Sequence, residues 1–277
     1  MARMRKKQKR IVILALSLAA LVVIAAGVLL FVGGKGLFIG TFASVDVSGQ
    51  MEAWQFRAPN GIVLPYRIYV PEDYDSETEY PLLLFLHGSG ERGNDNLAQV
   101  KKNSVMQTLL NEKNRKDYPC VVLAPQCPEE QRWFPRTEED NDFSIPNALM
   151  ALLEDTKKNY SIDTGRIYIT GLSMGGYGTW GLLTGLPNYF AAAVPICGGG
   201  NPEQIPGNLA QVPIWVFHGK RDSVVDVENS REMVQALKDI GSTVVKYTEY
   251  PWENHACWEL AYREADLFPW LFAQSKS

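Results

Sequence analysis

The sequence predicts an α/β fold in which a mostly parallel central sheet carries helices on both faces. Short, wholly apolar runs alternate with amphipathic segments, and residues capable of chemistry follow directly after several of these runs. Continuous apolar strands are typical of parallel sheets that are buried on both faces, and sites in such sheets lie beyond the carboxyl ends of the strands. The chain has 277 residues, 46% of them hydrophobic and 21% charged, which is enough to bury a sizeable core.

The expected elements follow from apolar periodicity and from the turns that bound it. We expect strands over residues 55–58, 64–70, 81–86, 120–125, 166–170, 191–196, 213–217 and 243–250. We expect helices over residues 94–110, 145–160, 177–186, 228–240 and 258–273. Residues 128–143 are charged and lack a pattern, so we expect them to form a loop over the strand ends.

The start of the chain differs in composition from the remainder. Residues 1–10 carry six Lys or Arg and no acidic residue, and residues 11–33 contain no charge and are long enough to cross a bilayer. This predicts a basic cytoplasmic end (1–10), a transmembrane signal anchor (11–33), a linker (34–50) and a catalytic domain (51–277) outside the cell membrane. The alternative is a cleaved signal peptide and a secreted protein.

Charge and cysteine usage exclude some classes of partner. After residue 45 the chain holds 20 basic and 31 acidic residues, which argues against a nucleic-acid partner. With three histidines and no C-x-x-C spacing, the sequence predicts no metal site. An extracytoplasmic location would permit disulfides, and three pairings stay open among Cys120, Cys127, Cys197 and Cys257.

A G-x-S-x-G pentapeptide, Gly171-Leu172-Ser173-Met174-Gly175, stands between a β-branched run and a helix-compatible segment. This context is typical of a nucleophile elbow, where a sharp turn raises the serine hydroxyl above the sheet. The flanking glycines are needed because a β-carbon at either would collide with the adjacent strand or helix. We predict Ser173 as the nucleophile.

A serine nucleophile needs a base, and a base needs an orienting acid. His87 and His218 lie in His-Gly turns directly after strands, where packing or hydrogen bonding beneath the loop is expected. His255 is the histidine that leaves room for an acid after Ser173, so we predict it as the base.

The acid is expected after a strand between the serine and His255. Asp222 meets this condition, whereas its competitor Asp226 is placed to cap the helix that begins near residue 227.

Two backbone N–H groups are expected to stabilise the oxyanion, those of Met174 and Ser89, with Gly90 beside the latter. The three charged residues that follow Ser89 are expected to brace this loop by ion pairs rather than to contact substrate; they are Glu91, Arg92 and Asp95.

Substrate contacts are harder to assign from sequence. We expect two tryptophans to bind substrate, Trp258, three residues after His255, and Trp133 in the long loop.

Residues 86–93, 171–178 and 218–225 together resemble the α/β-hydrolase superfamily. The likeness is greatest to its dienelactone-hydrolase-like and phospholipase/carboxylesterase branch, which includes predicted peptidases of the prolyl-oligopeptidase type and lies near feruloyl and acetylxylan esterases. It spans residues 51–273 and implies ester or peptide hydrolysis without a cofactor. Asn254 stands before His255, where such proteins frequently have glycine, and no propeller segment of the large oligopeptidases is present.

We therefore expect a membrane-anchored serine esterase that acts on small-molecule or oligosaccharide esters, with carbohydrate-linked acetyl or feruloyl esters among the candidate substrates. The alternatives are a serine peptidase acting on short peptides and a surface binding module that has lost its chemistry. The sequence does not indicate an oligomeric state.

Overall fold

The computed structural model describes residues 28–32, 37–41, 46–101, 103–137 and 140–276. The chain divides into two compact units, Met1–Val45 and Asp46–Ser277.

In the first unit, β1 (Val28–Val32) pairs with β2 (Leu37–Thr41) in antiparallel register. β1 is the last part of the predicted anchor and β2 lies within the predicted linker. The rest of the anchor lies outside the described residues, so it stays a prediction. Among the residues described, no helix is both long and apolar enough to span a membrane.

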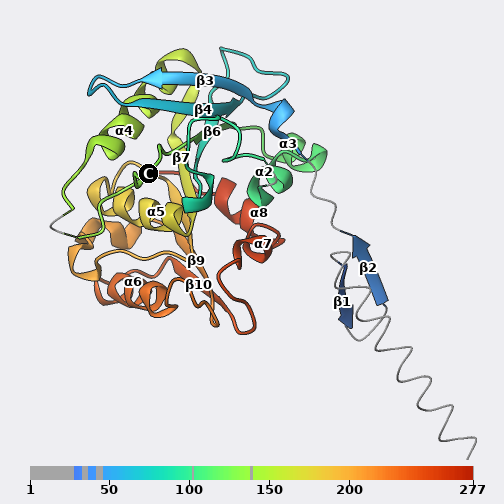
Figure 1. Cartoon of the computed structure of the whole chain (residues 1–277), viewed down its shortest axis with the longest axis vertical. Coiled ribbons are helices and arrows are strands. Elements are labelled where there is room, and N and C mark those ends of the chain that lie inside the picture. The colour runs from blue at the N-terminus through green and yellow to red at the C-terminus, as the bar shows by residue number, and fades with distance from the viewer. Residues whose placement is uncertain (1–27, 33–36, 42–45, 102, 138–139, 277) are drawn as a thin grey trace, which may run out of the picture. The chain divides into compact units, whose positions relative to one another are not determined.

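The second unit is built on an eight-stranded sheet with the order β10-β9-β8-β7-β5-β6-β4-β3 (Figure 1). The six strands from β10 to β6 in this order run parallel, and β4 and β3 continue the sheet in antiparallel pairing. The mostly parallel sheet is therefore confirmed. The strands are β3 (Glu52–Arg57), β4 (Val63–Tyr69), β5 (Tyr80–Leu86), β6 (Val121–Pro125), β7 (Ile162–Leu172), β8 (Ala192–Ile196), β9 (Ile214–Gly219) and β10 (Val245–Tyr250).

Helices cover both faces of this sheet (Figure 1). Residues of α4, α5 and α6 join one hydrophobic cluster, and residues of α2, α7 and α8 join the other. The helices are α2 (Ser104–Leu109), α3 (Glu112–Asp117), α4 (Ser144–Asn159), α5 (Met174–Gly185), α6 (Glu228–Asp239), α7 (Trp258–Ala261) and α8 (Leu267–Phe272), with 3₁₀ turns η1 (Ser48–Gln50), η2 (Ser89–Glu91), η3 (Pro202–Gln204) and η4 (Gly207–Gln211).

The central strand β5 shows why an unbroken apolar run was needed. Leu82, Leu84 and Leu86 belong to the cluster on one face, and Leu83 and Phe85 belong to the cluster on the other; all five are fully buried. Successive side chains of a strand point to opposite faces, so a strand with a helical layer on each side has no position left for a polar residue.

Two predicted helices are shorter than expected. Within the described part of residues 94–110, α2 is the helix that forms. The Asp95 carboxylate accepts the N–H groups of Leu97 and Ala98 at 2.9 and 3.1 Å and so competes with a helical turn at the start of this segment. Asn96 adopts a φ of 51°, and Asn103 caps α2 through the N–H of Val105.

The last predicted helix, over residues 258–273, is divided into α7 and α8. Pro269 explains the break, since a proline lacks the N–H of a continuous helix and fits only in the first turn. It lies in the first turn of α8, which therefore starts anew at Leu267.

We predict that Leu84→Ala lowers the free energy of unfolding by about 2 to 5 kcal/mol, because it leaves a cavity between β5 and the helices of one face. Urea denaturation measures this change. The matched control is Val224→Ala, whose side chain is 70% exposed and whose effect should stay within about 0.5 kcal/mol. Equal effects of the two substitutions would contradict the assignment of β5 to the core.

Candidate active site

The residues selected from the sequence meet beyond the carboxyl ends of the parallel strands. Ser173 directly follows β7, Asp222 lies three residues after β9, and His255 lies five residues after β10. Parallel strands end at one edge of the sheet, so segments far apart in the sequence are brought together there.

The turn at Ser173 is strained, with φ 53° and ψ −115°. Its N–H donates to the carbonyl of Ile196 at 2.9 Å, which ties the turn to the end of β8. A β-carbon at Gly171 or Gly175 would collide with backbone, the first with the Gly175 carbonyl and the second with the Leu86 carbonyl. Glycine is therefore required at both positions, as the pentapeptide predicts.

A chain of hydrogen bonds links the three side chains. Ser173 Oγ lies 2.9 Å from His255 Nε2, and His255 Nδ1 lies 2.7 Å from Asp222 Oδ2. The carboxylate accepts, so Nδ1 carries the imidazole proton and Nε2 is free to accept the serine proton. This arrangement can activate a hydroxyl for attack on a carbonyl carbon.

Asp222 has no exposed side-chain surface. Burial alone would raise the pKa of Asp222. Hydrogen bonds from His255 and from the N–H groups of Val225 and Val224 outweigh burial, so the pKa of the carboxyl lies below its ordinary value. The group is thus a carboxylate that can stabilise an imidazolium.

Asp226 lies outside this network. Its carboxylate accepts the N–H of Glu228, the first residue of α6, at 3.0 Å. The two carboxylates thus have different partners, His255 for Asp222 and the N–H of Glu228 at the start of α6 for Asp226, and the role of Asp222 as the acid stays a prediction.

The two expected oxyanion donors lie at the start of α5 and in η2. Met174 is the first residue of α5, so its N–H has no acceptor within the helix, and Ser89 is the first residue of η2 and is exposed. Both positions are free to donate, and their role stays a prediction.

His87 supports the turn that carries Ser89. Its Nε2 accepts the N–H of Cys127 at 2.9 Å, so Nδ1 carries the proton and donates to the Gly88 carbonyl at 2.6 Å. Burial lowers the pKa of His87 to about 4. His87 is thus a neutral residue beneath the loop, as expected from its His-Gly turn.

Trp133 does not line a substrate site. Its side chain is fully buried, and its indole N–H donates to the His87 carbonyl at 2.9 Å. With no exposed surface it cannot contact a substrate, and the observed role of Trp133 is to hold the His87 turn. Trp258 is half-buried, with its ring edge-on to His255 at 5.4 Å between centroids, so its proposed substrate contact stays open.

Hydrogen bonds hold the charged residues after Ser89 in the loop. Gln126 Nε2 donates to Asp95 Oδ1 at 2.8 Å and to the Glu91 carbonyl at 3.0 Å. Arg92 Nε donates to Met174 Sδ at 3.3 Å. The loop is therefore braced in its described part by hydrogen bonds from Arg92 and from Gln126, which follows β6, and not by the ion pairs that were expected.

All four cysteines are buried and free. Cys197 follows β8 with a φ of 40°, and burial raises the pKa of its thiol. Within the described parts of the chain, one group of three potential metal ligands occurs: Cys197, Asp222 and His255, with ligand atoms within 4.8 Å of one another. Two of these are the hydrogen-bonded pair described above, which accounts for their proximity.

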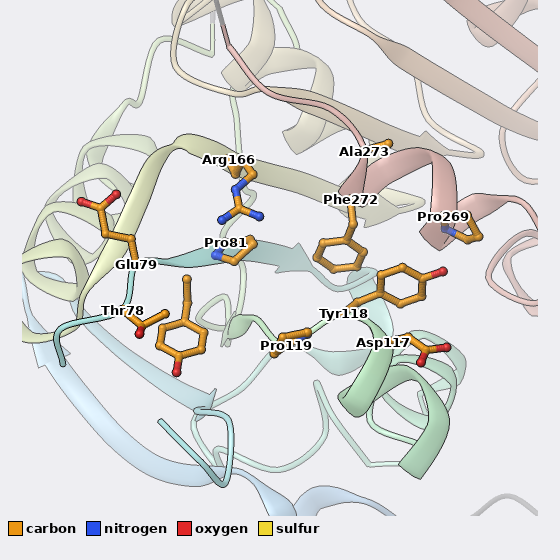
Figure 2. Close-up of a pocket in the computed structure, with 11 residues that line it drawn as sticks. Thr78, Glu79, Pro81, Asp117, Tyr118, Pro119, Arg166, Pro269, Phe272 and Ala273 are labelled. Carbon is orange, nitrogen blue, oxygen red and sulfur yellow. The ribbon is translucent and has the colours of Figure 1, made fainter. Parts of the chain in front are cut away.

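A cavity of about 510 Å³ lies away from these residues (Figure 2). It is lined by residues that include Tyr80 and Pro81 at the start of β5, Arg166 in β7 and Phe272 in α8. Because Ser173 follows the carboxyl end of β7, this cavity at the starts of the strands does not belong to the same site.

Residues 124–261 match the dienelactone hydrolase family, and this span includes Ser173, Asp222 and His255. The chain belongs to the α/β-hydrolase superfamily. A solved structure of a thermostable esterase is 41% identical to this α/β-hydrolase, with a TM-score of 0.78 over 83% of this chain and 64% of that one.

Two curated relatives of this α/β-hydrolase are esterases by name. A bifunctional acetylxylan esterase/xylanase of Neocallimastix patriciarum is 26% identical over 187 residues, which are 66% of this chain and 25% of that protein. A probable feruloyl esterase C of Aspergillus terreus is 28% identical over 169 residues, 61% of this chain and 58% of that protein. The chain thus spans about a quarter of the first relative and rather more than half of the second.

Sequence reasoning placed His218 beneath its loop but missed its partner. The imidazole contacts Asp222, four residues further on. The spacing from a strand-end histidine to the acid was visible in the sequence, but the folding of the loop back onto the histidine was not.

The buried His87 predicts a pH-dependent stability. The neutral form is held in the folded state, where its pKa is about 4, whereas the unfolded chain protonates near 6.5. His87 therefore contributes stability above about pH 6.5 that is lost as the pH falls toward 4, by an amount of the order of 3 kcal/mol.

The experiment is urea denaturation of the wild type and His87→Asn at several pH values through this window. The difference in unfolding free energy between the two proteins should shrink as the pH falls. A difference that does not vary with pH would contradict a neutral buried His87.

Proposed function

We propose that this α/β-hydrolase is a serine carboxylic-ester hydrolase that uses Ser173, His255 and Asp222 as a triad. The observation that carries the proposal is the continuous hydrogen-bond chain from Ser173 Oγ through the imidazole to a buried carboxylate, at 2.9 and 2.7 Å. The esterases among its relatives support the same reaction class.

The reaction follows from the geometry. Ser173 Oγ attacks the ester carbonyl while His255 Nε2 takes its proton, and Asp222 stabilises the imidazolium that forms. The N–H groups of Met174 and Ser89 stabilise the oxyanion. His255 then gives the proton to the departing alcohol, leaving an acyl-serine, and a water activated by the same imidazole releases the acid.

We propose acyl esters, including carbohydrate-linked acetyl or feruloyl esters, as the substrate class. The names of the two relatives, an acetylxylan esterase/xylanase and a probable feruloyl esterase, support this choice. Trp258 stands beside His255 and is our proposed contact for the substrate. A comparison of acetyl and feruloyl esters with aminoacyl amides separates this reading from a peptidase, which would turn over the amides instead.

We also propose that the N-terminal segment places the catalytic unit outside the membrane. The support is the sequence itself, six basic residues followed by 23 uncharged ones in residues 11–33. A mature N-terminus beginning near residue 44 would replace the anchor by a cleaved signal.

We predict that Ser173→Ala lowers kcat on p-nitrophenyl acetate by about 10⁴-fold or more, since the nucleophile is lost. The same variant should not react with a fluorophosphonate probe, which labels an activated serine. Ser76→Ala is the matched control, an exposed serine between β4 and β5, and should keep both properties. Activity retained without Ser173 Oγ would end the proposal.

A further inference from the structure

His218 is a buried histidine that the reaction described above does not use. It lies in β9 as the residue before Gly219, and its side chain has no exposed surface. The loop after β9 folds back over it and brings Asp222 against its ring.

The partners of the ring fix its protonation. Nε2 lies 3.1 Å from Asp222 Oδ2 and 3.1 Å from the Val225 carbonyl, and both of these groups only accept. The proton must therefore be on Nε2. Burial lowers the pKa of His218, so the ring is a neutral donor at neutral pH, with the Ser230 hydroxyl 2.7 Å from Nδ1.

Asp222 Oδ2 therefore accepts from two imidazoles. His255 Nδ1 lies 2.7 Å away and His218 Nε2 lies 3.1 Å away, while Oδ1 accepts the N–H groups of Val224 and Val225 at 2.8 and 2.9 Å. With both oxygens engaged, the carboxylate has one orientation. Each added donor also takes a share of its negative charge, which weakens its hold on an imidazolium.

We propose that His218 is a positioning residue that orients Asp222 and sets how strongly Asp222 stabilises the protonated form of His255. The effect of His218 on catalysis rests on the proposed function, in which His255 is the base. This effect does not make His218 catalytic, because its ring nitrogens bond to Asp222, the Val225 carbonyl and the Ser230 hydroxyl and not to a group that reacts with the substrate.

A comparison with His87 distinguishes this role from packing. His87 is an equally buried histidine that also precedes a glycine at a strand end, yet both of its ring nitrogens bond to backbone groups. His218 instead shares its Nε2–H between the Val225 carbonyl and the carboxylate that holds His255, each at 3.1 Å. Ser230 in α6, which also lies 3.1 Å from the Gly198 carbonyl, fixes the ring from the opposite side.

Among the residues that the structure describes, four titratable groups interact with Asp222: His255, His218, the Cys197 thiol and the Tyr177 phenol. Burial raises the pKa of both Cys197 and Tyr177, so neither is charged near neutral pH. If a His218 substitution shifts the acidic limb of the pH profile of kcat/KM, the shift would therefore report on the protonation of His255.

The experiment compares His218→Leu, which removes the donor, with His218→Gln, which keeps an N–H near the Nε2 position. For His218→Leu we expect kcat on p-nitrophenyl acetate to fall about tenfold to hundredfold with little change in KM. The acidic limb of kcat/KM should move to higher pH by about half a unit to one unit, because a carboxylate with fewer donors holds the imidazolium more tightly. His218→Gln should return both values toward the wild type.

Thr156→Val is the control for loss of a buried hydrogen bond, since Thr156 donates to the Leu152 carbonyl within α4. Thr156→Val should leave the acidic limb of the kcat/KM profile at the wild-type pH. His218→Asn, whose amide is too short to reach Asp222, should behave like His218→Leu and replaces it if the leucine variant does not fold. An acidic limb at the wild-type position in the donor-less variants would overturn the proposal even if activity falls.

A second readout separates this inference from the proposed function. In the Ser173→Ala background, NMR follows the pH midpoint at which the His255 ring protonates, with and without His218→Leu. The midpoint should rise when His218 is replaced, whether or not the protein hydrolyses esters, and an unchanged midpoint would overturn the role of His218 alone. Ester hydrolysis that survives Ser173→Ala would instead overturn the proposed function.

Discussion

The left-handed turn at Ser173 is the constraint on which the rest of the site depends. A non-glycine residue at φ 53° is unfavourable unless its surroundings hold it there, and here the end of β7, the start of α5 and the Ile196 carbonyl do so. This close packing around the turn requires glycine at positions 171 and 175, where backbone atoms of α5 and β5 leave no space for a β-carbon. A strained turn in the middle of a parallel sheet then places the serine where the loops after β9 and β10 can reach it.

Burial decides what the groups around that serine can do. Asp222 is enclosed yet accepts four N–H groups, so it is ionised where an unpaired buried carboxyl would be neutral. His87 is enclosed with backbone partners and is neutral, which suits a residue that holds a loop. Removal from water thus disfavours the charged form at both positions, and donated hydrogen bonds overcome this cost only at Asp222.

The sheet and the three linked side chains could be predicted from sequence because their signals are local. An apolar run such as β5 and a Gly-Ser-Gly turn indicate their structure within a few residues, and chain order selected the acid and the base. What could not be predicted depends on tertiary contacts. Asp95 ends a helical pattern because its carboxylate bonds to nearby N–H groups and to Gln126. Trp133 packs in a hydrophobic cluster, where the His87 carbonyl accepts its indole N–H. His87 and His218 occupy similar His-Gly turns, and only the folded loop shows that His218, unlike His87, also bonds to Asp222.

The most direct test of the account is the detection of an acyl-enzyme on Ser173. The protein is mixed with p-nitrophenyl acetate, quenched in acid within the first turnovers, digested and analysed by mass spectrometry. The account predicts one added acetyl group on the peptide that contains Ser173, and its disappearance as the ester is consumed. An acetyl group found only on other residues would contradict it. Ester hydrolysis during which the quenched samples show no acetyl group on Ser173, even where release of the acyl group is the slow step, would also contradict it.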